Sequence, residues 1–317
     1  MKQGLTYTFV LVFWAVGCQP AVGIEPIQPT QIQDLSLSPT LPLPATATAK
    51  AAASLQDFAF TPAPTPAPPL TPTPDTRLTA RYWREWITVP DLSPLARQIL
   101  SHALNNPDLD PHTFSKVGDC QMTSGTFLGG YASAKYPIPA DFTDTVEWFS
   151  ESMLTDGPTS DGGLGISSVL NPMFALSAGY DQCLKNETPL DCELRTRRPI
   201  IVLIGMGTNW MPNAEISFEK YLRTVVDRIL ETGALPILAT KADNVEENWM
   251  LNQAIAQVAY DYDLPLVNVW RSVQDLTGRG IEKKVYLTPD GWGCRNHVWL
   301  AMLDKIHETL KDQRIQP

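Results

Sequence analysis

The sequence is poor in basic residues and has no long apolar run. Lysine and arginine total 24 against 34 acidic residues, which gives a net charge of −10 and a pI near 4.9. A protein that binds nucleic acid independently of sequence needs a basic surface, so we expect no nucleic-acid partner. No apolar run reaches the roughly 18–20 residues that span a bilayer, which excludes a polytopic membrane protein.

The usual signatures of cofactor and metal binding are missing as well. The sequence has no phosphate-binding loop and no dinucleotide-binding fingerprint. Its five cysteines and four histidines do not have the spacing of a zinc site. We therefore expect neither a cofactor nor a bound metal.

The N-terminus has the layout of an export signal. Lys2 precedes an apolar stretch at 5–16, and Ala15-Val16-Gly17-Cys18 follows. Small residues directly before a cysteine resemble the bacterial lipobox, although Ala15 stands where leucine is commoner. We expect residues 1–18 to be a lipoprotein signal, with Cys18 lipidated and the chain held outside the cytoplasm at a bacterial membrane. The alternative is an ordinary secretory signal in which Cys18 occurs by chance.

Residues 19–78 are rich in proline, threonine, alanine and serine. Of the 28 prolines in the chain, 13 fall between Pro20 and Pro74. Such a segment buries too little apolar surface to offset the entropy lost on ordering. We expect a disordered tether that could hold a domain on the order of 100 Å from the membrane.

The remaining residues, 79–317, are expected to form one folded domain. Apolar runs that suit buried strands alternate with amphipathic stretches that suit helices, which predicts a parallel sheet covered on both faces. The expected strands are 113–118, 199–207, 235–240 and 264–269, and the expected helices are 95–104, 217–231, 246–262 and 295–311. Ligand sites in such sheets lie at the carboxyl ends of the strands.

The residues at those strand ends resemble the SGNH, or GDSL-type, hydrolases. Gly118-Asp119-Cys120 stands where that family has Gly-Asp-Ser, and 205–209 stands where it has Gly-x-Asn-Asp. The stretch 163–167 is similar to its block Asn-x-Gly-x-Ser. The resemblance covers most of 112–311 and implies a three-layer α/β/α, flavodoxin-like fold.

The resemblance also implies a chemistry, namely ester hydrolysis by a serine, a histidine base and an aspartate. Three donors would hold the developing oxyanion. Carried over, they are the backbone N–H groups of Cys120 and Gly165 and the side-chain amide of Asn209, with Gly163 as a rival for the second. Trp210 stands where the family has an aspartate and would offer a stacking face.

This sequence departs from the family at the nucleophile. Cys120 replaces serine, and a thiol attacks only as a thiolate, which needs a base or a positive field nearby. Its neighbour Asp119 opposes such a field. The alternative is that Cys120 is a small, unreactive residue.

It departs again at the base. In one alignment Lys283 and Tyr286 replace the aspartate and histidine, and a tyrosine accepts a proton poorly at neutral pH. In a second alignment, through Asp290, the histidine position is Gly293. His297 follows seven residues after Asp290 and would be the base if the loop folds inward; otherwise it is a solvated helix residue.

The other cysteines suggest disulfides, because an exported chain meets oxidising conditions. Cys183 and Cys192 bracket a short polar loop and are expected to pair. We also hypothesise a bridge between Cys120 and Cys294, which would remove any thiolate.

These observations leave three alternative functions. The first is a tethered domain with a degenerate triad that binds a glycan or an acylated surface polymer without turnover. The second is an active esterase with Cys120 as nucleophile and Asp290 and His297 as its partners. The third is a partner-binding module with a vestigial pocket. We expect a monomer, and Tyr286 and Trp210 to contribute to any binding surface. Trp83 and Trp86 either stack on sugars or fix an N-terminal strap to the core.

Overall fold

The computed structural model describes residues 77–160, 164–177, 180–209 and 215–315. They belong to one compact unit of the chain, Thr73–Pro317. The predicted signal with Cys18 and almost all of the predicted tether lie outside the described residues.

Four parallel strands form the central sheet, in the order β1-β2-β3-β4. Their bounds are β1 Asp110–Gly118, β2 Pro199–Gly205, β3 Leu235–Ala239 and β4 Leu266–Val267. β2 and β3 are almost entirely buried, as expected of strands covered on both faces. Gly118 at the end of β1 pairs with Gly205 at the end of β2, so these two strands finish level with each other.

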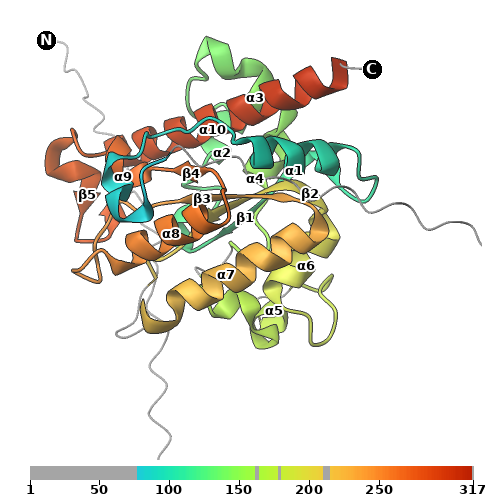
Figure 1. The fold of residues 1–317 in the computed structure, drawn as a ribbon, viewed down its shortest axis with the longest axis horizontal. Coiled ribbons are helices and arrows are strands. Elements are labelled where there is room, and N and C mark those ends of the chain that lie inside the picture. The colour runs from blue at the N-terminus through green and yellow to red at the C-terminus, as the bar shows by residue number, and fades with distance from the viewer. Residues whose placement is uncertain (1–76, 161–163, 178–179, 210–214, 316–317) are drawn as a thin grey trace, which may run out of the picture. The chain divides into compact units, whose positions relative to one another are not determined.

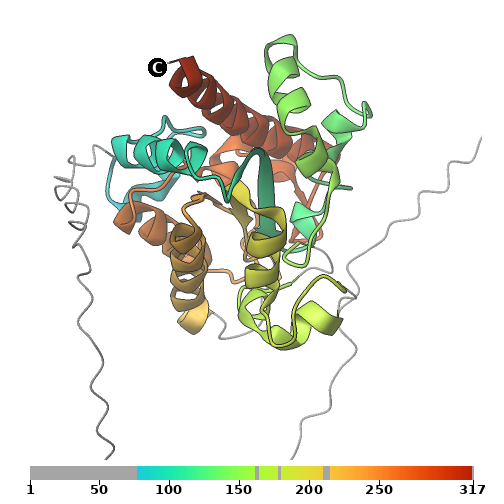
Figure 2. The ribbon, with the colours of Figure 1, turned by 90° about the vertical axis from the view of Figure 1, so that its right-hand side faces the viewer.

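Helices cover both faces of this sheet, which makes a three-layer α/β/α fold. Figure 1 shows α1 and α10 on one side and α6, α7 and α8 on the other, and the quarter turn in Figure 2 separates the same two groups. The helices are α1 Pro94–Leu104, α2 Gly129–Ala132, α3 Thr143–Trp148, α4 Ser150–Leu154, α5 Pro172–Ser177, α6 Pro189–Arg197, α7 Glu215–Thr232, α8 Met250–Asp261, α9 Val269–Ser272 and α10 Pro289–Ile315. In the described part of the chain, no helix has the length and apolar character needed to cross a membrane.

The expected parallel sheet and its flanking helices are present, but two of the helices start four or more residues from their predicted positions. α8 begins at Met250 instead of residue 246. α10 begins at Pro289, six residues before the predicted start. Its first turn has the usual start signal, since Thr288 Oγ1 accepts a hydrogen bond from the N–H of Gly291 at 3.1 Å and proline occupies the first helical position.

A small antiparallel hairpin precedes α10 and was not predicted. Its strands are β5 Ile281–Glu282 and β6 Tyr286–Leu287. Both strands have only two residues, too few for the alternation that reveals a strand in sequence.

The N-terminal segment is a strap on the core. The short 3₁₀ helix η1 (Ala80–Glu85) buries Trp83, and Trp86 follows it, also buried. The Trp83 ring packs edge-on against Trp270 with centroids 5.1 Å apart. Trp83 and Trp86 therefore fix the strap and are not free to stack on a sugar.

Asn268 joins this strap to the ends of two strands. Its side-chain amide donates to the carbonyls of Trp83 (2.8 Å) and Trp86 (3.2 Å). Its oxygen accepts from the Thr240 hydroxyl and from the N–H of Arg271, each at 3.1 Å. Because Asn268 is fully buried, these four bonds replace all contact of the amide with water.

We predict that Asn268→Ala lowers the free energy of unfolding by about 2–4 kcal/mol, because buried partners lose their bonds without gaining water. Urea unfolding measures the change. Asn105→Ala is the control: Asn105 is exposed and makes only a local bond to the Ser101 carbonyl, so the loss should stay below about 0.5 kcal/mol. Equal losses in the two variants would contradict this role of Asn268.

Candidate functional site

The carboxyl ends of β1 and β2 meet at a corner built around two glycines. A Cβ on Gly118 would lie 2.1 Å from Met122 Cγ, and a Cβ on Gly205 would lie 2.6 Å from Met122 Sδ. Side chains at these positions are therefore excluded by the packing of Met122 between the two strand ends. The chain turns sharply after each glycine, and the two turns lie against each other.

Asp119 ties the two turns together. Its Oδ1 accepts the N–H of Gln121 at 3.1 Å, and its Oδ2 accepts the N–H groups of Thr208 (2.9 Å) and Asn209 (3.3 Å). The side chain is buried, and burial raises the pKa of Asp119 to about 6. The nearby Asp243 raises this pKa further, whereas the three N–H groups oppose the shift.

The corner brings together residues that the sequence assigned to one site. Cys120 follows Asp119 directly and is half-buried, and Asn209 is exposed on the turn after β2. Gly165 lies beside Asn209, since a Cβ on Gly165 would be 3.7 Å from the Asn209 carbonyl oxygen. The rival donor Gly163 and the aromatic Trp210 lie outside the described residues.

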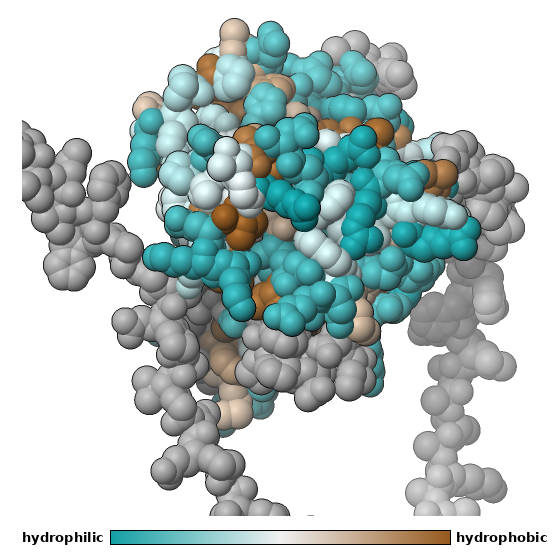
Figure 3. Space-filling model, turned by 90° about the vertical axis from the view of Figure 1, so that its left-hand side faces the viewer, coloured by the Kyte–Doolittle hydropathy of each residue, from teal (hydrophilic) through white to brown (hydrophobic). Residues whose placement is uncertain are grey.

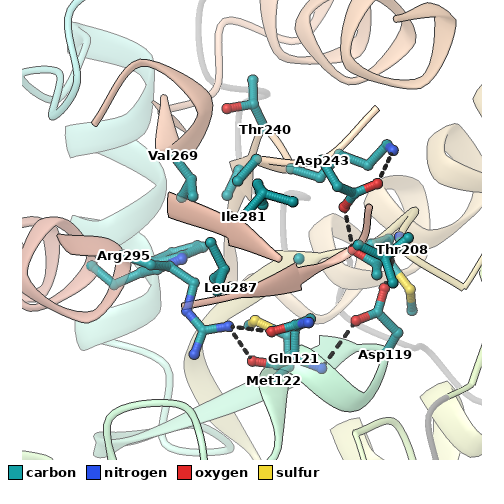
Figure 4. A pocket seen from close by; sticks show the side chains of 17 residues that line it. Asp119, Gln121, Met122, Thr208, Thr240, Asp243, Val269, Ile281, Leu287 and Arg295 are labelled. Carbon is teal, nitrogen blue, oxygen red and sulfur yellow. Dashed lines mark hydrogen bonds and ion pairs between the residues drawn. The ribbon is translucent and has the colours of Figure 1, made fainter. Parts of the chain in front are cut away.

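A small cavity lies behind this corner, with a volume of about 40 Å³. That volume holds only a few water molecules. Figure 4 shows Asp119, Thr208 and Asp243 along one side of it and Arg295 on the other. The hairpin forms another wall through three apolar side chains, those of Ile281, Val285 and Leu287.

A buried ionic group forms the wall at the end of β3. Lys241 Nζ donates to Asp243 Oδ1 at 2.6 Å and to Glu246 Oε2 at 2.5 Å. The Thr208 hydroxyl donates to the other oxygen of Asp243 at 2.8 Å, which links this group to the turn after β2. Since the side chains of Lys241, Asp243 and Glu246 are at most 4% exposed, removing Lys241 would leave two carboxylates inside the protein without their cation.

Arg295, on α10, is the cation on the opposite wall. Its guanidinium donates to the carbonyls of Gln121 (2.7 Å) and Thr126, and to the side chain of Asn296. Burial lowers the pKa of Arg295 to about 10, while Asp119 and Tyr136 act against the shift. The guanidinium still remains protonated at neutral pH, so it can stabilise negative charge but cannot accept a proton.

None of the four histidines lines this cavity, and all four are described. His297 is exposed on α10 and contacts the ring of Phe142. Arg295 and His297 are two residues apart on one helix, which places them about 200° apart around its axis. Because Arg295 faces the cavity, His297 faces away from it.

His297 instead lines a second, more open groove of about 580 Å³, which shares no lining residue with the cavity. Cys294 lies in the same groove, one helical turn before His297. The structure thus does not bring His297 to the cavity beside Cys120. Asp290 is exposed in the first turn of α10.

Tyr286 does not line the cavity either. Its neighbours Val285 and Leu287 do, and successive side chains of a strand alternate between its two sides. Tyr286 therefore lies on the far side of the hairpin.

The two proposed disulfides have different outcomes. Cys183 and Cys192 form a disulfide, as the short loop between them predicts. The hypothesised bridge between Cys120 and Cys294 is wrong, because Cys294 is a free thiol. The physical reason is the early start of α10, which places Cys294 on the groove side of this helix and not on the cavity side. Cys120 is itself disulfide-bonded, so it does not offer the thiolate that the predicted nucleophile needs.

The described residues contain two groups of side chains of the kind that bind metals. One includes Cys183 and Cys192, whose sulfur atoms are already joined in a disulfide. The other is Asp304, His307 and Glu308, where the Thr145 hydroxyl lies between Asp304 Oδ1 (2.6 Å) and His307 Nδ1 (3.0 Å). Neither group is part of the cavity.

The sequence analysis named no role for three charged residues of the cavity, Lys241, Asp243 and Arg295. A signal existed for Lys241, since it comes directly after the predicted strand 235–240. Arg295 had no such signal, because its orientation depends on where α10 begins.

A search against protein-family models finds no match to this chain, and a comparison with curated proteins finds no significant relative.

We predict that Asp119 makes stability depend on pH. Its folded pKa of about 6 exceeds the ordinary value of 3.8, so the folded state binds more protons between these values and loses stability as the pH rises from about 4 to about 6. Asp119→Asn removes this titration and places an amide group against backbone N–H donors, which costs about 1–3 kcal/mol.

Urea unfolding of both proteins at pH 4, 5, 6 and 7 measures this effect. The wild-type advantage should be largest at pH 4 and shrink towards pH 7. A difference that is constant over this range would show that Asp119 does not titrate there.

We also predict that Cys294 is a slow but accessible thiol. It is half-buried in the open groove, and burial, then Asp290, raises the pKa of its thiol. Iodoacetamide should therefore modify Cys294 slowly at pH 7 and faster above pH 9. Asp290→Asn should speed the modification at pH 8, as followed by peptide mass spectrometry. A rate unchanged by Asp290→Asn would rule out this carboxylate as a cause.

Proposed function

We propose that the folded domain is a divergent SGNH-like domain that binds an acylated ligand at the bacterial surface without hydrolysing it. The lipobox-like Cys18 and the proline-rich segment would hold it there as a tethered receptor. The proposal is supported above all by the composition of the cavity behind Asp119, where a buried guanidinium occupies the helix face from which a catalytic base would be expected.

The groups around the corner suit binding better than turnover. Acyl transfer needs a group that removes the proton of the nucleophile. The cavity offers the guanidinium of Arg295, which stays protonated, and, among its described lining residues, no imidazole. Its carboxylates, Asp119 and Asp243, already accept hydrogen bonds from backbone N–H groups, Thr208 and Lys241.

The donors proposed for the acyl oxygen lie on the outer side of the corner. Cys120 and Asn209 lie on the two turns that the hydrogen bonds of Asp119 connect, and Gly165 lies beside Asn209. Because the cavity itself holds only a few waters, the ligand would rest on this outer surface with its carbonyl oxygen towards the donors.

Binding is tested first, on the full-length chain. Calorimetry measures its affinity for acetylated and for deacetylated xylo-oligosaccharide. We expect the acetylated form to bind about tenfold more tightly, and Asn209→Ala to remove the preference by deleting one donor. Asn105→Ala, far along the chain and exposed, is the control and should keep it. An equal affinity for the two sugars would overturn the proposal in favour of a domain with a vestigial pocket.

Hydrolysis is measured with p-nitrophenyl acetate on the wild type, Cys120→Ala and His297→Ala. We expect all three to match the buffer rate. Turnover above the buffer rate in the wild type would overturn a receptor that does not hydrolyse its ligand.

A further inference from the structure

The hairpin beside the cavity carries a group of basic side chains without ion-pair partners. We name residues 279–287 the basic hairpin. Arg279, Lys283 and Lys284 are exposed, and within the described residues none of the three forms a side-chain hydrogen bond or an ion pair. Glu282 and Asp290 are the acidic residues nearest in sequence, so this segment has a small positive excess in a chain of net charge −10.

Elsewhere on the surface, several exposed cations are paired. Arg195 meets Glu187 at 2.7 Å and Lys305 meets Asp91 at 2.6 Å. The unpaired lysines of the basic hairpin are thus available to an external anion.

The backbone conformation of the turn does not favour lysine at these two positions. Lys283 and Lys284 have φ values of 48° and 72°, in the left-handed region. Glycine and asparagine adopt this region most easily, and hairpin loops that need it favour Asn-Gly. A sequence that places two lysines there accepts backbone strain, which is typical of functional positions.

The basic hairpin is fixed at its base and lies next to the cavity. The N–H of Thr288 donates to the Gly280 carbonyl at 2.8 Å, and a Cβ on Gly291 would lie 2.4 Å from that same oxygen. Its apolar side chains, including Ile281 and Leu287, form a wall of the cavity (Figure 4). The lysines at the tip are therefore attached to the cavity wall by only a few residues of backbone.

The face that carries the hairpin is polar. Figure 3 views the molecule from the side on which β5 lies in Figure 1, and its coloured residues are mostly hydrophilic, with small and separate apolar patches. Such a surface suits a hydrated polymer better than the acyl chains of a membrane.

We propose that the basic hairpin binds carboxylate groups of the ligand, so that the acylated polymer held at the corner is an acidic glycan. This inference rests on the proposed function and adds the charge of its ligand. At physiological salt the Debye length is about 8 Å, so the lysines near a bound carboxylate act more strongly than the distant negative charge of the rest of the chain.

The test uses Lys283→Asn together with Lys284→Gly in the full-length chain. These residues favour the left-handed turn, so the melting temperature should stay the same or rise. Calorimetry with acetylated polygalacturonate at 0.15 M salt should show about tenfold weaker binding than the wild type. The control, Lys135→Asn with Lys185→Asn, removes two exposed lysines elsewhere and should change the affinity less than twofold.

The methyl ester of the same acetylated polymer, which lacks the carboxylates, separates this inference from the proposed function. The wild type should bind it about as weakly as the hairpin variant binds the acidic form. If the acid and its ester bind equally well, the hairpin inference fails while the acyl receptor stands. If neither binds, the hairpin inference fails, and the binding of acetylated xylo-oligosaccharide decides whether the proposed function stands. An equal loss in the Lys135 and Lys185 control, or tighter binding of poly(glycerol phosphate) than of polygalacturonate, would also overturn the assignment to carboxylates.

Discussion

The arrangement of the whole corner depends on the buried carboxylate of Asp119. It holds the turn after β1 and the turn after β2 through three backbone N–H groups. Burial works against its charge, and the N–H groups favour it. The side chains of Thr208 and Asp243 extend the same connection to the end of β3, so three strand ends are linked through partly buried polar contacts.

The sheet could be predicted from sequence because its strands are continuous apolar runs, of which β2 is the clearest. The start of α10 could not. Gly291 and Gly293 weaken the helical pattern after Pro289 and hide the start signal of Thr288 and Pro289, whereas in the structure Gly291 packs closely against Gly280. The hairpin β5–β6 was missed for a related reason: its strands are short, and its turn has lysines in place of the usual Asn-Gly.

The candidate site was predictable to the extent that it follows the strands. Asp119, Cys120 and Asn209 come directly after β1 and β2, so the topology alone brings them to one edge of the sheet. The residues on α10 could not be placed in this way, because a shift of the helix start changes which side chains face the sheet. Arg295 and Trp299, four residues apart, line the cavity, whereas Cys294 and His297 line the groove on another side of the helix.

The two sides of α10 carry different chemical groups. On the cavity side, Arg295 contacts the corner, and its guanidinium donates to the carbonyls of Gln121 and Thr126. Replacing it with an imidazole would break these bonds, at a cost of about 1 kcal/mol for each bond lost, although Asn296 still donates to the Thr126 carbonyl. A single substitution that places a histidine at position 295 would therefore weaken the packing of α10 against the turn after β1. The same contacts that stabilise the corner thus keep an imidazole away from the cavity side of α10.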